Sequence, residues 1–286
     1  MSHVRGLRAL GSLAVLVSLG NLSASAQEIK KVFVIAMENH NWTQPANQFT
    51  GKIQQIYQNP NAPFTNSLVN GTAYAVINDR TVNISEHVAY ATAYHNVLAP
   101  PSGNNPHIHP SEPNYLWAEG GSNFGVLNDN DPYTGGTNQN TNLHLSNLLT
   151  KAGKTWKSYQ EDIDLSRNSA GQLINFPLPK DQWTVPLTSF SGVFGSNSSN
   201  EFNDSSQYNY AAKHDPMVLF TDTNGGNNAT PSNRLSSHYA PLQQLLKDLK
   251  SGNVSDYNWI SPDQYNVSLR ARPFFPWSFE DDSLKA

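Results

Sequence analysis

Two polar residues, Glu38 and Asn39, directly follow the first long apolar segment of the chain. That segment, at 31–37, predicts a strand buried on both faces, as in a parallel sheet. A carboxylate and an amide carbonyl at the carboxyl end of such a strand offer hard oxygen ligands to a divalent cation. The alternative interpretation is that Asn39 only shapes a turn and Glu38 is solvated.

Ser111 lies at the predicted start of a short helix, with Pro113 in the first turn and glycines at 120–121 at its end. The structural interpretation is an N-cap, which accepts a hydrogen bond from the helix backbone. The chemical interpretation uses the partial positive charge of the helix start, which holds a phosphate and stabilises a deprotonated serine. Ser111 would then attack phosphorus and form a phosphoseryl intermediate.

His214 stands between a possible helix and the apolar run at 217–220. A single histidine at such a junction is either structural or a donor of a proton or hydrogen bond to a phosphate oxygen. The sequence alone leaves both interpretations open.

The elements that position these residues alternate between helix and strand. A helix after Pro63 that ends at Gly71 precedes a strand at 73–77, and leucines at 143–149 predict a helix before a strand at 155–159. Leucines at 242–249 precede a strand at 257–260 in the same way. This order predicts an α/β fold with a mostly parallel sheet, and the segments 99–142 and 164–210 are expected to be long surface excursions.

The first 26 residues have the layout of a signal peptide: two arginines, an apolar stretch at 9–19, and Ala24 and Ala26 before the cleavage point. A membrane anchor is the alternative, but the stretch is shorter than the roughly 20 residues that span a bilayer. We therefore expect a secreted or periplasmic protein without a membrane span after cleavage. The chain has no cysteine, so no disulfide holds the fold, and a net charge of −4 argues against nucleic acid as a partner.

Five fragments resemble, in sequence order, the bacterial phosphoesterase family of secreted acid phosphatases and phospholipase C-type enzymes. They are Met37–His40, His109–Leu116, Trp156–Glu161, Lys213–Pro216 and Trp259–Asp263. The resemblance covers 32–266 and implies the alkaline phosphatase superfamily. It therefore implies an α/β/α sandwich with the metal and the nucleophile at the carboxyl edge of the sheet.

The resemblance also implies roles for individual residues. Glu38 and Asn39 match positions that bind the divalent metal, Ser111 matches the nucleophile and a further metal ligand, and His214 matches a position near the phosphate. His109 is a looser match to a substrate-binding position. The expected substrate is a small phosphoester or a phospholipid. The leading interpretation is a metal-dependent phosphomonoesterase of the acid phosphatase type that acts through a phosphoseryl intermediate. The alternatives are a phospholipase C-type diesterase, a non-catalytic exported binding protein or an inactive relative.

The resemblance ends near Asn266. In relatives the chain continues there into an Asp and a His and later into an acidic pair that completes the metal site. Here residues 267–286 form a divergent tail. We therefore expect a phosphoesterase domain over 27–266 that is incomplete at its C-terminus, and a chain that catalyses poorly as it stands.

Overall fold

The computed structural model describes residues 29–38, 42, 55–60, 62–91, 110–130, 132–133, 135–191 and 208–264. Two of the predicted site residues, Asn39 and His109, lie outside the described residues, as do the predicted signal peptide and the tail at 267–286.

A four-stranded sheet forms the centre of the fold. Its strand order is β1–β8–β4–β7, and every neighbouring pair is parallel. The strands are β1 (Val32–Ile35), β4 (Trp156–Gln160), β7 (Tyr239–Pro241) and β8 (Tyr257–Ser261). The predicted α/β class with a parallel sheet is confirmed.

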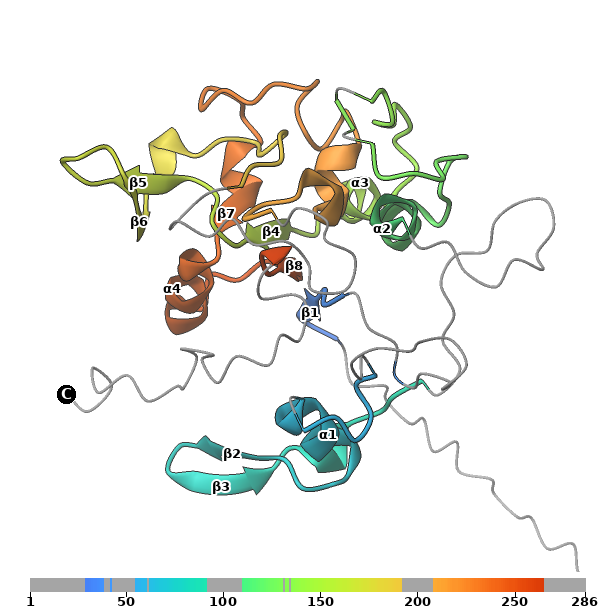
Figure 1. Cartoon of the computed structure of the whole chain (residues 1–286), viewed down its shortest axis with the longest axis vertical. Coiled ribbons are helices and arrows are strands. Elements are labelled where there is room, and N and C mark those ends of the chain that lie inside the picture. Colours follow the sequence, from blue (N-terminus) through green and yellow to red (C-terminus); the bar gives the residue numbers. More distant parts are fainter. Residues whose placement is uncertain are drawn as a thin grey trace, which may run out of the picture. The chain divides into compact units, whose positions relative to one another are not determined.

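Helices lie on both faces of this sheet, which makes three layers (Figure 1). Helices α2 (Ser111–Gly120) and α3 (Leu145–Lys151) contribute to the apolar cluster that includes Trp156 and Trp259. Helix α4 (Gln243–Ser251) packs through Leu245 against the second cluster, which contains Tyr159, Ile260 and Trp183. Successive residues of β4 and β8 belong to opposite clusters because side chains alternate across a strand.

The helix-to-strand order predicted for the second half of the chain is confirmed. Helix α3 precedes β4, and α4 precedes β8. Gly153 and Gly252 both have φ of +71°, so each supplies the left-handed residue that ends a helix. Short 3₁₀ segments connect the other elements: η1 (Ser85–His87), η2 (Lys180–Gln182), η4 (Ala212–His214), η5 (Pro216–Leu219) and η6 (Ser236–His238).

The strand predicted at 73–77 exists but does not join the parallel sheet. Helix α1 (Pro63–Val69) is followed by β2 (Tyr74–Ile77), which pairs antiparallel with β3 (Arg80–Asn83) in a separate two-stranded sheet. Asn78 and Asp79 have φ of +50° and +59°, the backbone of a two-residue hairpin turn. This turn reverses the chain at once, so β2 pairs with its sequence neighbour.

Strand β1 is not buried on both faces, contrary to the prediction. Val32, Phe33 and Ile35 are 38%, 41% and 63% exposed. The physical reason is its place at the edge of the sheet, where β8 is its one neighbour among the described strands.

The segment 164–210 was also wrongly expected to be a surface excursion throughout. It contains the antiparallel pair β5 (Leu165–Arg167) and β6 (Leu173–Pro177). After η2 it buries Trp183, Val185 and Leu187 in the two cores. Widely spaced apolar residues among polar ones conceal this contribution in the sequence.

Candidate active site

Three of the predicted site residues meet in one cluster. The Ser111 hydroxyl donates to the Glu38 carboxylate, with Oγ 2.8 Å from Oε2 and 3.1 Å from Oε1. His214 Nε2 lies 2.9 Å from Glu38 Oε1. The structure thus brings together residues that the sequence separates widely, whereas Asn39 and His109 cannot be placed because they lie outside the described residues.

The parallel sheet explains why Glu38 reaches this cluster. Strand β1 runs parallel to β8 up to the pair Ile35 and Ile260, and the Ala36 amide then donates to the Ile260 carbonyl at 2.9 Å. Glu38 therefore follows the carboxyl end of β1, at the edge of the sheet where α/β proteins place their ligands. The structure thus has Glu38 at the predicted strand end, whereas its role as a metal ligand stays a prediction.

Ser111 is the first residue of α2 and is not its N-cap. Pro110 occupies the N-cap position, and its side chain makes no capping hydrogen bond. Instead the Asp129 carboxylate accepts a hydrogen bond of 2.9 Å from the Glu112 amide in the first turn. The N-cap interpretation of Ser111 was wrong, because another residue supplies the cap and the serine hydroxyl is directed to Glu38.

The charge of Glu38 is strongly stabilised. Burial raises the pKa of this carboxyl, but the charge and contact of His214, the Ser111 hydrogen bond and the charge of Lys213 outweigh it and lower the pKa to about 2. Glu38 therefore stays a carboxylate at any pH near neutrality. Such a group is a poor acceptor for the serine proton and a good oxygen ligand for a cation.

His214 is held from two sides. Its ring, 2% exposed, stacks on Tyr115 of α2 with ring centroids 4.9 Å apart. Its carbonyl oxygen accepts a hydrogen bond of 2.8 Å from the Ser261 hydroxyl at the end of β8. The approach of Nε2 to Glu38 has the length of an ion pair but lacks hydrogen-bond alignment, so within the described chain this buried nitrogen has no aligned acceptor.

Lys213, for which the sequence predicted no role, lies beside the cluster. Its ammonium lies 2.6 Å from Asp129 Oδ2, while Asp129 Oδ1 accepts from the Glu112 amide. The charge of Lys213 helps to lower the pKa of Glu38. Its position next to His214 in the Lys213–Pro216 fragment was the available signal.

A cation would find oxygen donors in this cluster. Glu38 and Ser111 present carboxylate and hydroxyl oxygens within one small volume, which fits a hard divalent ion. Over the described ranges, however, no three His, Cys, Asp or Glu side chains form a metal-binding group. The described residues therefore supply part of a coordination shell.

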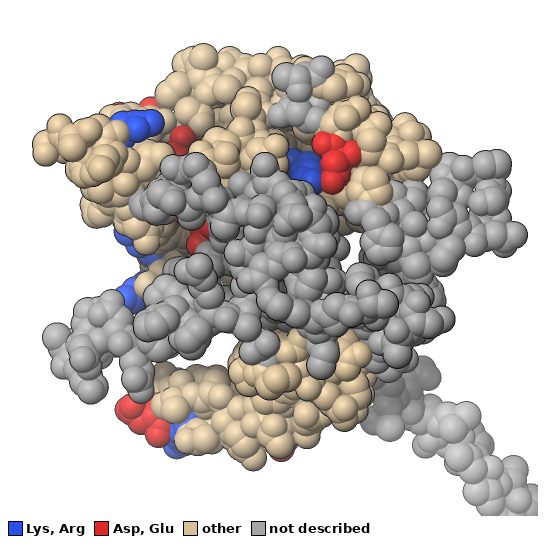
Figure 2. Space-filling view, in the orientation of Figure 1, with Lys and Arg blue, Asp and Glu red and all other residues tan. Residues whose placement is uncertain are grey.

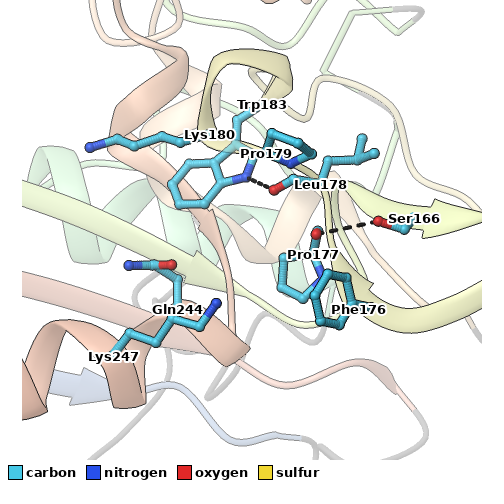
Figure 3. A pocket seen from close by; sticks show the side chains of 9 residues that line it. All are labelled: Ser166, Phe176, Pro177, Leu178, Pro179, Lys180, Trp183, Gln244 and Lys247. Carbon is cyan, nitrogen blue, oxygen red and sulfur yellow. Dashed lines mark hydrogen bonds between the residues drawn. The ribbon is translucent and has the colours of Figure 1, made fainter.

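A cavity of about 490 Å³ lies elsewhere, between η2, β6 and α4 (Figure 3). It is lined by Ser166, Phe176, Pro177, Leu178, Pro179, Lys180, Trp183, Gln244 and Lys247. None of the cluster residues contributes to it. On the face drawn in Figure 2, the charged side chains of the described residues are scattered and do not form one patch. No helix in the described parts is long and apolar enough to cross a membrane.

A serine hydroxyl, a carboxylate and an imidazole that meet beyond the carboxyl end of a parallel strand are typical of an α/β enzyme. Comparison with known proteins specifies which kind. The chain belongs to the Phosphoesterase family, whose sequence model matches residues 30–269.

Two curated relatives are acid phosphatases by name. A probable acid phosphatase of Kluyveromyces lactis and an acid phosphatase of Aspergillus fumigatus are each 27% identical to this chain over 158 residues. The matched region is 55% of this chain but 29% and 27% of the two relatives. The match thus spans less than a third of the curated relatives, and it confirms the family resemblance seen in the five fragments.

Proposed function

We propose that the chain is part of an exported, metal-dependent phosphomonoesterase of the acid phosphatase type. One observation carries the proposal: Ser111, Glu38 and His214 converge at the carboxyl end of β1. Membership of the Phosphoesterase family and the names of the two relatives support hydrolysis of phosphoric esters. The signal-peptide layout of the first 26 residues supports export.

Ser111 is the proposed nucleophile. Its oxygen forms a bond to phosphorus while the bond from phosphorus to the leaving alcohol oxygen breaks, and water then hydrolyses the phosphoseryl group. The neighbouring Glu38 carboxylate opposes loss of the serine proton, because two negative charges would stand about 3 Å apart. Positive charge is therefore required at this point.

A divalent cation is the proposed source of that charge. Glu38 and Ser111 would bind it, and the family resemblance adds Asn39. Bound there, the ion would favour the deprotonated serine and neutralise charge on the phosphoryl group. The low pKa of Glu38 supports this role, because the carboxylate needs no deprotonation step before it binds a metal.

His214 and Lys213 are the proposed partners of the phosphate. The buried Nε2 of His214, next to Glu38, is suited to donate to a phosphoryl oxygen or to the leaving group. The Lys213 ammonium adds a positive charge on the same side. Two groups of this kind favour a phosphomonoester dianion over a diester, which carries a single negative charge.

The test compares wild type with Ser111→Ala and Ser146→Ala. Ser146 is a matched control because it also lies in the first turn of a helix, and its buried hydroxyl has no partner in the described structure. Each protein is assayed on p-nitrophenyl phosphate, a bis-ester and phosphatidylcholine, with and without Mg²⁺, Ca²⁺, Mn²⁺ or Zn²⁺. Acid quenching with ³²P-labelled substrate detects a phosphoenzyme.

We expect metal-dependent monoester hydrolysis that Ser111→Ala reduces by at least about 10³-fold, as for loss of a nucleophile. The phosphoenzyme should disappear in the same variant, and Ser146→Ala should resemble wild type. An unchanged rate in Ser111→Ala would refute the nucleophile. Faster hydrolysis of phosphatidylcholine than of the monoester would refute the substrate class.

A further inference from the structure

Near the C-terminal end of α2, the end away from Ser111, the buried side chain of His144 lies between two carboxylates. Its Nδ1 is 2.8 Å from Glu119 Oε1, and its Nε2 is 2.8 Å from Asp222 Oδ1. A neutral imidazole has a single N–H and so can donate at one of these contacts only. Asp222 is partly exposed and also accepts from the Asn147 amide at 2.6 Å, which suits an ionised carboxylate. With both carboxylates ionised, both ring nitrogens must donate, and the geometry then points to a protonated, cationic His144.

The surroundings of His144 are mostly acidic or neutral. Glu119 Oε1 also accepts from the Ser146 amide, and the His144 ring stacks on Phe220 with centroids 4.1 Å apart. Nearby titratable groups that sense the charge of Glu119 or Asp222 are Asp215, Tyr239 and Tyr257. In the described chain no lysine or arginine pairs with Glu119 or Asp222, so His144 is their cationic partner there.

These contacts set the charge state of His144. Burial lowers the pKa of the imidazole, but the hydrogen bonds and charges of Glu119 and Asp222 outweigh burial and raise the pKa above its ordinary value of 6.5.

His144 joins the two segments that carry Ser111 and His214. Glu119 lies eight residues after Ser111 on α2, which is ~12 Å along the helix axis. Asp222 follows η5, which directly follows the 3₁₀ turn that ends at His214. Helix α2 also packs against both η4 and η5. Loss of the two His144 contacts would therefore remove one link between α2 and the segment after η5, while the direct packing of α2 on η4 and η5 remains.

We propose that cationic His144 is a positioning residue that keeps Ser111 and His214 in register, and that loss of its proton loosens the site at alkaline pH. The catalytic part of this inference rests on the proposed function. Because the folded pKa is raised, the stabilisation by His144 is complete below about pH 6.5 and is lost as pH rises through the folded pKa. The arrangement thus favours an enzyme that works on the acidic side.

His238 provides a matched control. It is also a buried histidine on an aromatic ring, with its centroid 4.3 Å from that of Trp156, but its Nδ1 faces a backbone carbonyl at 3.0 Å. Burial lowers the pKa of His238, so its charge responds to folding with the opposite sign. The experiment uses the full chain as wild type, His144→Gln and His238→Gln.

The first readout is NMR titration of the imidazole resonances, which needs no enzymatic activity. We expect His144 to titrate above 6.5 and the His214 resonances to shift at that same pKa. The His214 shift should be absent in His144→Gln and retained in His238→Gln. Titration of His144 below 6.5, or His214 resonances that do not shift at the pKa of His144, would overturn the inference.

The second readout is urea unfolding across pH 5–9. Each unit by which the folded pKa exceeds 6.5 is about a tenfold factor in the folding equilibrium constant. The advantage of wild type over His144→Gln should therefore shrink as pH rises above 6.5, whereas its advantage over His238→Gln should grow as pH rises toward 6.5 and stay constant above it. If His144→Gln does not fold, Glu119→Gln replaces it, and a lowered His144 pKa is expected in that variant.

The third readout is the pH profile of phosphomonoester hydrolysis. We expect the rate of wild type to fall at alkaline pH, and we expect His144→Gln to lower kcat at acidic pH and to lack this fall. If wild type is inactive with every cation, both alone and when extended by a relative's C-terminal segment, the proposed function is refuted, while the NMR and unfolding data would still decide the role of His144. If the His214 resonances shift at the pKa of His144 but the pH profile of hydrolysis is the same in His144→Gln as in wild type, the catalytic part of the inference alone is overturned.

Discussion

Asp215 is a fully buried carboxyl group, and its replacement by asparagine tests the electrostatics of the core. Its Oδ1 accepts a hydrogen bond of 3.0 Å from the Ser158 hydroxyl of β4, and Oδ2 is a buried oxygen with no partner in the described chain. Burial raises the pKa of Asp215, and the hydrogen bonds from Ser158 and the Met217 backbone offset this only in part, so that the pKa is about 8. The folded protein therefore holds a protonated Asp215 at neutral pH.

The direction of the effect on stability follows from proton binding. The ordinary pKa of an aspartate is 3.8, so between about pH 4 and pH 8 the folded state binds a proton that the unfolded state has lost. The stability of wild type falls with rising pH over this range. At ~1.36 kcal/mol per pH unit, the loss from pH 4 to pH 7 is ~4 kcal/mol.

The variant Asp215→Asn has nearly the same shape and no titrating proton. We expect the unfolding free energy of the variant minus that of wild type to increase by ~4 kcal/mol between pH 4 and pH 7 and to level off above about pH 8. Urea titrations followed by the fluorescence of the six tryptophans measure this difference at each pH.

Asp256→Asn is the control of opposite sign. Hydrogen bonds from Thr155 and Lys31 lower the pKa of this exposed carboxyl to about 2, so its contribution is present at neutral pH and disappears in acid. The same difference should therefore decrease for Asp256→Asn as pH rises from about 2 to about 4, and stay flat from pH 4 to pH 8, where it increases for Asp215→Asn. A flat or decreasing difference for Asp215→Asn would refute the assignment of a buried, protonated Asp215.

Two further predictions concern a turn and the N-terminus. A Cβ at Gly225 would lie 2.4 Å from the side chain of Asn233, whereas at Gly226 it would meet open space, and both glycines have positive φ. In urea unfolding, Gly226→Ala should cost ~1 kcal/mol and Gly225→Ala ~2–4 kcal/mol, and equal costs would contradict the packing at Asn233. N-terminal sequencing of secreted protein should begin at Gln27, and recovery of material that retains the apolar stretch at 9–19 would favour an anchor.

The sequence predicted the α3–β4 and α4–β8 units well because their signals are local. Leucines at helical spacing, a glycine after the last turn and an apolar strand all fall within about 15–20 residues. Strand β7 was missed for the opposite reason. It has three residues and ends at Pro241, so it is too short to show alternation. Proline is tolerated there because β7 lies at the edge of the described sheet, where β4 is its one described neighbour.

The partners of each strand were harder to predict than the strands themselves. An apolar run such as 74–77 suits a parallel or an antiparallel neighbour equally. The hairpin turn at Asn78 and Asp79 determines that its neighbour is antiparallel. Likewise the run at 31–37 suggested a central strand, but its position at the sheet edge depends on which strands follow much later in the chain.

The same distinction between local and long-range signals applies to the residues of the candidate site. Glu38, Ser111 and His214 could be predicted because a strand end, a helix start and a family fragment each mark one of them locally. The groups that hold α2 in place have no such signal: Asp129 meets the Glu112 amide and Lys213 at one end, and Glu119 meets His144 at the other. Each contact joins single residues from distant segments, without periodicity or spacing. Physical chemistry states that buried charges need partners, but only the fold decides which partners they find.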